Sequence, residues 1–206
     1  MLVHHLNNSR SQRILWMLEE LGLPYEVRRY ERDPKTLFAP SQLKQLHPLG
    51  KSPMIEDEGQ VIVESGSIVE YLVEKTGGRL GPEGERDAAL RYRMFLHYAE
   101  GSVMPPLLLK LVLSRIPIMG RFAIRRIQPM IDVHLDFIES ELAQRPWFAG
   151  DAMTAADIMM SFPIEAAYHR GGLDQTRPST LKWLNKIQAR PAYRRAIEVG
   201  GPYAYG

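Results

Sequence analysis

The sequence contains no cysteine among its 206 residues. The absence of cysteine excludes disulfide bonds, thiolate metal sites and a cysteine nucleophile. Any thiol chemistry carried out by this chain must therefore use the sulfur of another molecule. The rest of the composition is ordinary, since apolar residues make up 45% and charged residues 24%, as in an average globular protein.

The sequence also carries little net charge. Twenty-six lysines and arginines stand against 24 aspartates and glutamates, which leaves a formal charge of +2. A charge this small gives no general attraction to a polyanion, so DNA or RNA is not expected as the main partner. One basic cluster, Arg121, Arg125 and Arg126, either touches an anionic surface or forms the solvated face of a helix. The small net charge favours the solvated face.

Long hydrophobic runs are missing as well. The most apolar region, residues 103–119, is broken by Lys110, Arg115 and three prolines. It therefore falls short of the ~20 apolar residues that a membrane-spanning helix needs. Residues 1–10 begin with only three apolar residues before two histidines and lack the apolar core of a secretory signal. We expect a cytoplasmic protein without a membrane span.

Several kinds of catalytic motif are absent. The six histidines form no His-x-x-x-His pair and no carboxylate cluster at metal-ligand spacing, so no metal site is expected. No glycine-rich phosphate loop precedes a helix and no Gly-x-Ser-x-Gly elbow occurs, which gives nucleotide transfer and serine hydrolysis no support. His4 and His5 alternate across the first predicted strand. We expect one of them to be buried and hydrogen-bonded rather than catalytic.

Two halves of the chain differ in pattern. Residues 77–84 contain five glycines or prolines in eight positions, which is the composition of a linker. The pattern predicts a first domain of residues 1–78, a linker of residues 79–86 and a second domain of residues 87–206.

In the first half, short apolar runs are interleaved with helical periods in the order βαβ, an irregular stretch, then ββα. The predicted strands are residues 2–6, 25–30, 53–56 and 61–63, and the predicted helices are residues 14–21 and 67–76, ended by Gly22 and Gly77. In the second half helical spacing dominates, in residues 92–113, 124–142, 155–168, 178–189 and 192–199. Thr154 and Asp157 have the spacing of a capping box, which favours a structural role for Asp157.

Five short strings, in the same order along nearly the whole chain, resemble one known family. They are residues 9–25, which begin Ser-Arg-Ser-Gln-Arg, residues 47–53, His-Pro-Leu-Gly-Lys-Ser-Pro, residues 64–66, Glu-Ser-Gly, residues 150–157 and residues 189–193. Together with the order of the two halves, they make the chain similar to the cytosolic glutathione transferases. The Ser-Arg-Ser entry and Glu19-Glu20 most resemble the serine-type, theta-like branches of fungi and bacteria.

This resemblance implies an α+β thioredoxin-like domain followed by an all-α domain. It implies a cytoplasmic homodimer that binds glutathione, needs no further cofactor and conjugates the thiol to small hydrophobic electrophiles in detoxification. Two alternatives stay open. In the first alternative, the chain is a glutathione-dependent peroxidase that acts on organic hydroperoxides. In the second, it is a non-catalytic scaffold that keeps the fold but does not activate the thiol.

The resemblance also indicates which residues hold glutathione. Ser65, before an apolar helical period, places amides and a hydroxyl where the helix dipole favours an anion, and Glu64 supplies the opposite charge for the ammonium group. Ser65 alternatively only caps its helix. In the family, a cis proline at the position of Pro53 lets the residue before it, Ser52, pair with the glutathione backbone. Lys51 either pairs with the glycyl carboxylate or is a surface lysine.

The thiol needs an activating group. Family members use Tyr, Ser or Cys after the first strand, and this chain has no Cys and no Tyr before Tyr25. Ser9 is the predicted activating residue, with Ser11 and Asn8 as alternates. Ser9 and Gln12 also have the spacing of a capping box, and one hydroxyl can both cap a helix and donate to sulfur. For the electrophile pocket, apolar spacing after the linker suggests Tyr98, Met104 and Leu108, although such a stripe also fits a helix core.

Overall fold

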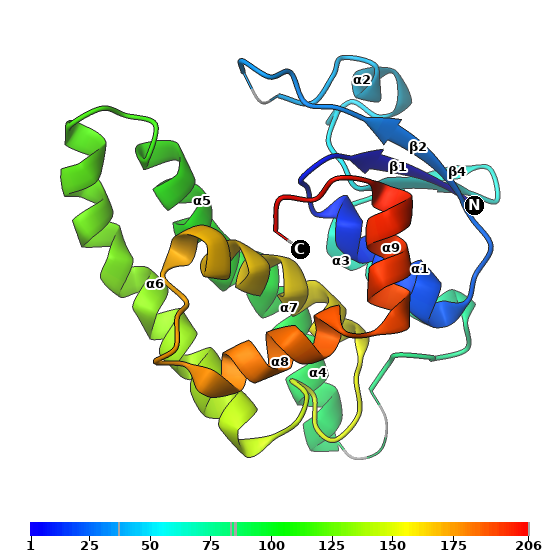
Figure 1. The fold of residues 1–206 in the computed structure, drawn as a ribbon. Coiled ribbons are helices and arrows are strands. Elements are labelled where there is room, and N and C mark those ends of the chain that lie inside the picture. The colour runs from blue at the N-terminus through cyan, green and yellow to red at the C-terminus, as the bar shows by residue number, and fades with distance from the viewer. Residues whose placement is uncertain (37, 83, 85, 206) are drawn as a thin grey trace. The chain divides into compact units, whose positions relative to one another are not determined.

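The computed structural model describes residues 1–36, 38–82, 84 and 86–205 (Figure 1). The chain divides into two compact units, the first formed by Met1–Arg79 with Gln188–Gly206 and the second by Leu80–Ile187. Glu83 and Glu85 of the predicted linker, and Gly206 of the predicted second domain, lie outside the described residues.

The first unit contains a four-stranded sheet in the order β2-β1-β3-β4. Its strands are β1 (Leu2–Leu6), β2 (Glu26–Tyr30), β3 (Met54–Asp57) and β4 (Gln60–Val63). β2 is parallel to β1, β3 is antiparallel to β1, and β4 is antiparallel to β3. Parallel neighbours need a crossover and antiparallel ones only a turn, so the helix α1 (Ser11–Leu21) joins β1 to β2. The predicted βαβ-ββα order is confirmed.

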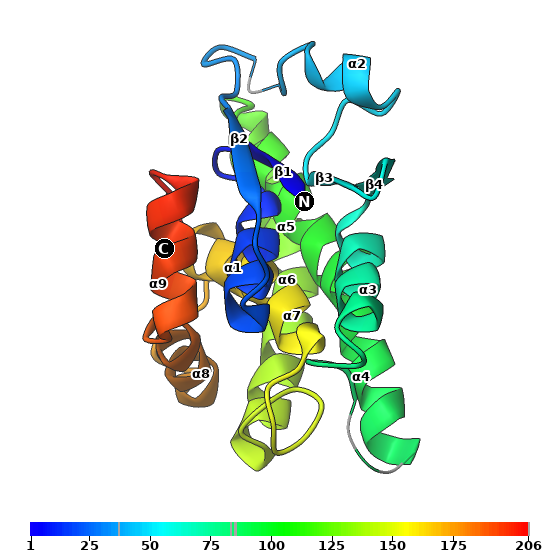
Figure 2. The same ribbon diagram turned by 90° about the vertical axis from the view of Figure 1, so that its right-hand side faces the viewer.

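Helices lie on both sides of this sheet. In both views α1 and α3 (Ser65–Lys75) lie on one side of the strands and the short α2 (Leu43–Leu46) on the other (Figures 1 and 2). Val3, Leu15, Ile55 and Ile68 are fully buried among these elements. α2 lies in the stretch predicted to be irregular, because four residues are too few to show a helical period.

The ends of the two long helices in the first unit agree with the sequence to different degrees. α1 ends at Gly22, as predicted, and Gly22 takes the left-handed conformation with φ of 62°. α3 begins at Ser65, two residues before the predicted start. Glu64, with φ of 69°, turns the chain directly from β4 into the helix, so the helix starts before its apolar period does.

The last helix, α9 (Pro191–Gly200), belongs to the first unit, although the sequence predicted one helical domain over residues 87–206. α9 packs against α1, where the Trp16 and Tyr193 rings meet edge to face with centroids 5.5 Å apart. Arg190 Nε donates to Glu20 Oε1 at 2.5 Å and Arg195 Nε donates to Glu19 Oε2 at 2.9 Å. These contacts involve residues far apart in sequence, which a local pattern does not reveal.

The second unit is helical, as predicted. Its elements are α4 (Arg86–Tyr98), η1 (Ala99–Val103), α5 (Met104–Leu113), α6 (Met119–Gln144), α7 (Ala155–Ala166), η2 (Ala167–Gly171) and α8 (Pro178–Gln188). The single helix predicted over residues 92–113 is interrupted by η1, a π-helical turn that keeps the apolar spacing nearly continuous. None of the described helices is both long enough and apolar enough to cross a membrane.

α7 begins with the predicted capping box. The Thr154 N–H donates to Asp157 Oδ2 at 2.9 Å. The fully buried Asp157 also accepts from the Phe148 N–H at 3.1 Å and from Trp183 Nε1 at 3.2 Å. Burial raises the pKa of Asp157 to about 6, and hydrogen bonds from these three neighbours limit the rise. The structural role predicted for Asp157 agrees with this geometry.

Candidate functional site

The predicted glutathione-binding segments converge at one end of the sheet. His4 near the end of β1 pairs with Met54 at the start of β3, and Met54 pairs with Val63 at the end of β4. The segments at this end are Ser9 after β1, Ser52-Pro53 before β3 and Glu64-Ser65 after β4. The sheet register alone therefore brings together residues that are more than 50 positions apart in sequence.

Ser9 lies in the turn between β1 and α1. Its Oγ accepts from the Ser11 N–H at 3.2 Å and lies 2.8 Å from Ser11 Oγ. The capping box expected between Ser9 and Gln12 does not form, and this expectation was wrong. Arg10 is the N-cap of α1, so Gln12 is one position too early to reach back to the cap. The Gln12 amide is instead buried, with neither its nitrogen nor its oxygen hydrogen-bonded.

Ser11 and Asn8, the alternates to Ser9, are both engaged in the local backbone. Ser11 is fully buried, and its Oγ accepts from the Leu6 N–H at 3.1 Å and lies 2.9 Å from His5 Nδ1. Asn8 has φ of 49°, and its Oδ1 accepts from the Ala204 N–H at 2.7 Å. Ser11 thus closes the turn from strand to helix, and Asn8 holds the C-terminal segment.

His5 is a hydrogen-bond partner within this cluster. Burial and the nearby Arg29 together lower its pKa to about 4, and a hydrogen bond to the Gly200 backbone offsets part of the shift. The ring is therefore neutral at pH 7, with one nitrogen donating and the other accepting. His5 Nδ1 lies 2.9 Å from Ser11 Oγ, and the Ser11 hydroxyl also donates to the Leu6 carbonyl at 3.2 Å. The Ser11 proton therefore has acceptors of its own, and the Ser9 hydroxyl can donate to Ser11 Oγ at 2.8 Å.

This order leaves the Ser9 proton available. Ser11 Oγ also accepts from the Leu6 N–H, so Ser11 keeps a donor when the Ser9 proton turns to another acceptor. Ser9 keeps its own donor, the Ser11 N–H, in the same way. The cluster thus presents a single reorientable hydroxyl at the start of α1, next to the positive end of the helix dipole. Ser9 is nearly buried, with 3% of its surface exposed.

The start of α3 has backbone amides that no described side chain caps. Glu64 is the N-cap residue and is exposed, and among the described residues no side chain caps the helix. The first hydrogen bond within the helix runs from the Ile68 N–H to the Glu64 carbonyl at 2.9 Å. The preceding amides, those of Ser65, Gly66 and Ser67, therefore have no helical acceptor. Ser65 is the first helical residue, so it does not cap α3.

Ser52 and Pro53 form the middle of the site. The Ser52-Pro53 peptide bond is cis. The Ser52 hydroxyl donates to the carbonyl oxygen of His4 on β1 at 2.9 Å, which fixes this loop to the sheet. Lys51, immediately before it, is exposed and forms no ion pair within the described part of the chain. Its ammonium group is available to a carboxylate.

Comparisons with known proteins agree with this arrangement. The family model described as "Glutathione S-transferase, N-terminal domain" matches residues 1–74, and "Glutathione S-transferase, C-terminal domain" matches residues 126–191. Glutathione S-transferase 3 of Schizosaccharomyces pombe is 40% identical over 212 residues, covering 96% of this chain and 86% of the relative. The chain belongs to the glutathione S-transferase family.

Two further similarities extend over the whole transferase. Glutathione S-transferase 1 of Saccharomyces cerevisiae is 31% identical over 219 residues, covering 95% of this chain and 93% of the relative. The crystal structure of a glutathione S-transferase from Actinobacillus pleuropneumoniae is 32% identical, has a TM-score of 0.87 and covers 99% of this chain and 94% of that one. The protein is thus a glutathione transferase, and glutathione is its substrate.

In the second unit of the transferase, the three residues predicted for the electrophile pocket have different environments. The Tyr98 hydroxyl lies 2.6 Å from His134 Nδ1, and burial raises the pKa of Tyr98 to about 12. Met104 is buried in the core of the unit, whereas Leu108, one helical turn later, is exposed. Only Leu108 offers a free apolar surface, while Tyr98 helps to hold α4 against α6.

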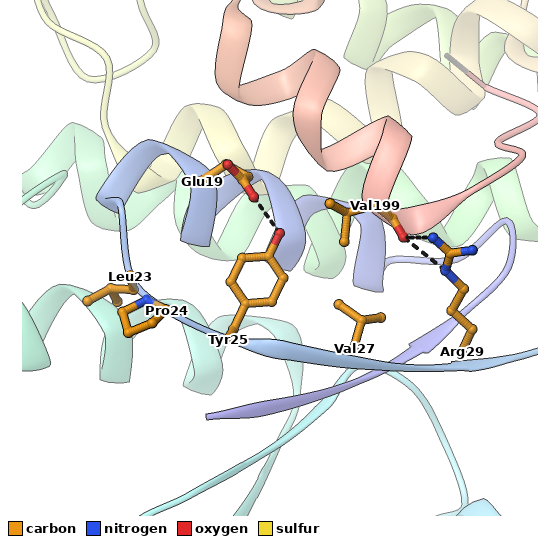
Figure 3. Close-up of a pocket in the computed structure, with 7 residues that line it drawn as sticks. All are labelled: Glu19, Leu23, Pro24, Tyr25, Val27, Arg29 and Val199. Atoms are coloured by element: carbon orange, nitrogen blue, oxygen red, sulfur yellow. Dashed lines mark hydrogen bonds between the residues drawn. The ribbon is translucent and has the colours of Figure 1, made fainter.

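A hollow of about 680 Å³ in the first unit of the transferase lies apart from the predicted residues. It is lined by Glu19, Leu23, Pro24, Tyr25, Val27, Arg29 and Val199 (Figure 3). Its polar groups bind one another, since Tyr25 donates to Glu19 at 2.6 Å and Arg29 Nε donates to the Val199 carbonyl at 2.9 Å. Burial raises the pKa of Glu19, but hydrogen bonds from Tyr25 and Arg195 outweigh it and lower the pKa overall. These hydrogen bonds connect Tyr25 to α1 and β2 to α9 within the first unit.

One of His4 and His5 was expected to be buried and hydrogen-bonded, and both are. His5 lies 2.9 Å from Ser11 Oγ, and His4 lies 2.9 Å from the Tyr30 hydroxyl and 2.7 Å from Glu56 Oε1. His5 lies on the same strand face as the apolar Val3, and this position was the sequence signal that could have indicated its buried partner. Among the described residues, no group of histidines and carboxylates is placed to hold a metal ion.

Proposed function

We propose that the transferase binds glutathione across the end of its sheet and ionises the thiol for addition to hydrophobic electrophiles. The observation that carries this proposal is the convergence of three segments with complementary chemistry: the Ser9 hydroxyl, the Ser52-Pro53 loop and the open amides of α3. Glutathione acts as co-substrate, and the reaction as proposed uses no further cofactor.

The γ-glutamyl end of glutathione binds at α3 in this proposal. Its carboxylate accepts from the free amides at the helix start, where the helix dipole favours an anion. The exposed Glu64 carboxylate pairs with the ammonium group of the same residue. Ser52 places its backbone beside the cysteinyl residue, and Lys51 pairs with the glycyl carboxylate. Opposite charges thus meet at both ends of the tripeptide.

The thiol lies at Ser9. A free thiol has a pKa near ~8.5 and is only slightly ionised at neutral pH. Lowering that pKa by about two units needs ~2.7 kcal/mol of preferential interaction with the thiolate. A hydrogen bond to a charged group contributes about 1.5–3 kcal/mol, and the start of α1 adds its dipole. Ser9 is favoured over the alternates because the Ser11 hydroxyl has acceptors of its own, His5 Nδ1 and the Leu6 carbonyl, and Asn8 Oδ1 holds Ala204.

The electrophile in this proposal contacts an apolar surface of the second unit that includes Leu108, with the predicted Met104 and Tyr98 in the same unit. Leu108 is 46% exposed, which supports contact with a small apolar molecule. The protein in this proposal orients and ionises glutathione, and glutathione itself forms the new bond. Conjugation of this kind removes reactive apolar compounds from the cytoplasm, where we place the protein.

We also infer a homodimer through α4 and α6. Leu90 and Met94 are one turn apart on α4, and Met130 and Val133 are three residues apart on α6. All four side chains have at least 41% of their surface exposed. Contacts such as Phe95 with Phe137, whose ring centroids are 6.1 Å apart, hold the two helices together. Exposed apolar residues on two joined helices support an interface with a second copy. Sedimentation of the purified protein as a monomer would contradict this inference.

The decisive experiment measures the thiolate itself. Glutathione added to the protein at neutral pH should produce the ultraviolet difference spectrum of a bound thiolate, and S-methyl glutathione, which has no thiol, serves as the control. Turnover of 1-chloro-2,4-dinitrobenzene should exceed turnover of cumene hydroperoxide. Binding of glutathione without the thiolate spectrum would identify the protein as a non-catalytic scaffold. Faster turnover of cumene hydroperoxide than of 1-chloro-2,4-dinitrobenzene would identify it as a peroxidase.

A further inference from the structure

The hairpin of α5 and α6 ends in a cluster of exposed apolar side chains. We define the hairpin tip as residues 112–126, which contain the end of α5, the connecting turn and the start of α6. Ile118, Met119 and Phe122 are 72%, 70% and 60% exposed, and Val112 and Ile116 are also exposed. Isolated exposed apolar residues are normal on a protein surface, but a contiguous group of this size indicates a binding surface.

The same tip is strongly basic. Residues 101–131 contain five lysines or arginines and no aspartate or glutamate, whereas the whole chain has a net charge of only +2. Lys110 is occupied, because its Nζ donates to Gln128 Oε1 at 2.5 Å. The four arginines of the tip, Arg115, Arg121, Arg125 and Arg126, are exposed and have no ion-pair partner among the described residues.

Basic and apolar groups meet in one small hollow of about 320 Å³, lined by Ile118, Arg121, Phe122 and Arg125. The Arg125 guanidinium lies 6.0 Å from the centre of the Phe122 ring. Guanidinium groups form paired hydrogen bonds with phosphate oxygens, and the neighbouring side chains offer no polar partner. This hollow therefore suits an anionic head group that is attached to an apolar chain.

We propose that the hairpin tip binds the surface of an anionic phospholipid bilayer. The arginines contact lipid phosphates, while Ile118, Met119 and Phe122 enter the boundary between head groups and acyl chains. Such binding is peripheral and needs no membrane-spanning helix. A second copy of the tip is a poor occupant, because eight unpaired guanidinium groups would face one another across the contact. The sequence alone favoured a solvated face for these arginines. The exposed apolar residues between them are the reason for proposing a membrane contact instead.

The test is co-sedimentation of the full-length protein with lipid vesicles. Vesicles of phosphatidylcholine mixed with phosphatidylglycerol should bind the protein, and vesicles of phosphatidylcholine alone should not. Replacing two arginines, as in Arg121→Gln with Arg125→Gln, should weaken binding at least about tenfold, since each surface cation contributes about 1 kcal/mol. Ile118→Ser with Phe122→Ser should weaken it comparably with the charge unchanged. Arg194→Gln, an exposed arginine on α9, is the matched charge control and should have no such effect.

Each outcome has a definite meaning. Equal binding of the tip variants and the native protein would overturn the proposal, as would equal affinity for neutral and anionic vesicles. A change in oligomeric state in the Ser variant, without a change in vesicle binding, would assign the tip to a second copy and would also overturn it. As a control, each variant should unfold at the same temperature as the native protein. A loss of vesicle binding is then not caused by a loss of folding.

Discussion

Two helices of this chain begin beside a cluster of buried polar side chains, and the two clusters are satisfied to different degrees. At the start of α7, Asp157 accepts hydrogen bonds from Thr154, Phe148 and Trp183, and every group there has its partner. At the start of α1, the Ser9 proton is free to turn, and the Gln12 amide has no partner.

The difference separates stability from chemistry. A saturated polar cluster in the interior rigidifies the fold and offers nothing to a substrate. A cluster with one spare donor is less stabilising, but it can make a new hydrogen bond when a thiolate arrives, without first breaking a necessary one. We therefore expect substitution of Asp157 at α7 to change mainly the free energy of unfolding and substitution of Ser9 at α1 to change mainly turnover.

The largest effect is expected at the saturated cluster. Asp157→Ala leaves three buried N–H groups without an acceptor, so the free energy of unfolding should fall by about 4 kcal/mol. Urea denaturation measures this change. Asp151→Ala, on an exposed loop, should stay within about 0.5 kcal/mol of the native protein. A stable Asp157→Ala variant with lost turnover would reverse the roles of the two clusters.

The two clusters should also respond to pH with opposite signs. His5 has a pKa of about 4 when folded and an ordinary pKa of 6.5 when unfolded, so the unfolded state binds its proton first and stability falls as pH drops from 6.5 to 4. Asp157 has a folded pKa of about 6 against 3.8, so the folded state binds its proton first and stability rises as pH drops from 6 to 3.8. Each contribution is roughly 3 kcal/mol at full extent.

These opposing contributions partly cancel in the native protein, and single variants should separate them. Asp157→Asn retains the His5 contribution, so its stability should fall more steeply with acid than that of the native protein. His5→Gln retains the Asp157 contribution, so its stability should fall less steeply. Urea midpoints between pH 4 and pH 6.5 measure both slopes. Identical slopes for all three proteins would show that neither group titrates as described.

At the open cluster, neighbouring serines should behave differently. Ser9→Ala should lower kcat about a hundredfold, which corresponds to the ~2.7 kcal/mol of thiolate stabilisation, while glutathione affinity and stability change little. Ser11→Ala removes the acceptor of the buried Leu6 N–H and should cost about 2 kcal/mol of stability instead. Steady-state kinetics and urea denaturation of both variants test this contrast. Unchanged turnover in Ser9→Ala would transfer the activating role to a neighbour.

The smallest effect is expected at Gln12. Gln12→Met removes two buried polar atoms that have no partner, so stability should rise by about 1 kcal/mol. The matched control is Gln128→Met, because the Gln128 amide binds Lys110, Asp132 and Gly171. That variant should lose about 1–2 kcal/mol. If both substitutions destabilise equally, the Gln12 amide is satisfied in solution.

The sequence predicted the parts of the fold that are encoded locally. A short apolar run located β1, and Gly22 marked the end of α1, where it adopts a left-handed conformation. The apolar spacing of residues 92–113 did not reveal the π-helical turn at 99–103, since that turn adds a residue without breaking the apolar face. The place of α9 depends on pairs such as Arg190 with Glu20, 170 residues apart. No local pattern contains that information.

The candidate site also has parts that the local sequence predicts and parts that depend on tertiary contacts. Glu64 and Ser65 were identified from their position after a strand, and the register then brought them to the end of β1. The Ser9 and Gln12 capping box was predicted from spacing alone and did not form, because the helix starts one residue later than the spacing assumed. The link from Ser11 to His5 depends on which strand face meets the helix, a tertiary property.

The return of α9 to the first unit has a consequence for synthesis of the chain. α1, which follows the first strand of the sheet, is covered by residues 191–200. A ribosome that has released residues 1–79 has therefore released an incomplete unit, with Trp16 still lacking Tyr193. The second unit, by contrast, is continuous in sequence from 80 to 187. The unit that begins first is therefore completed only after residues 191–200 have been synthesised.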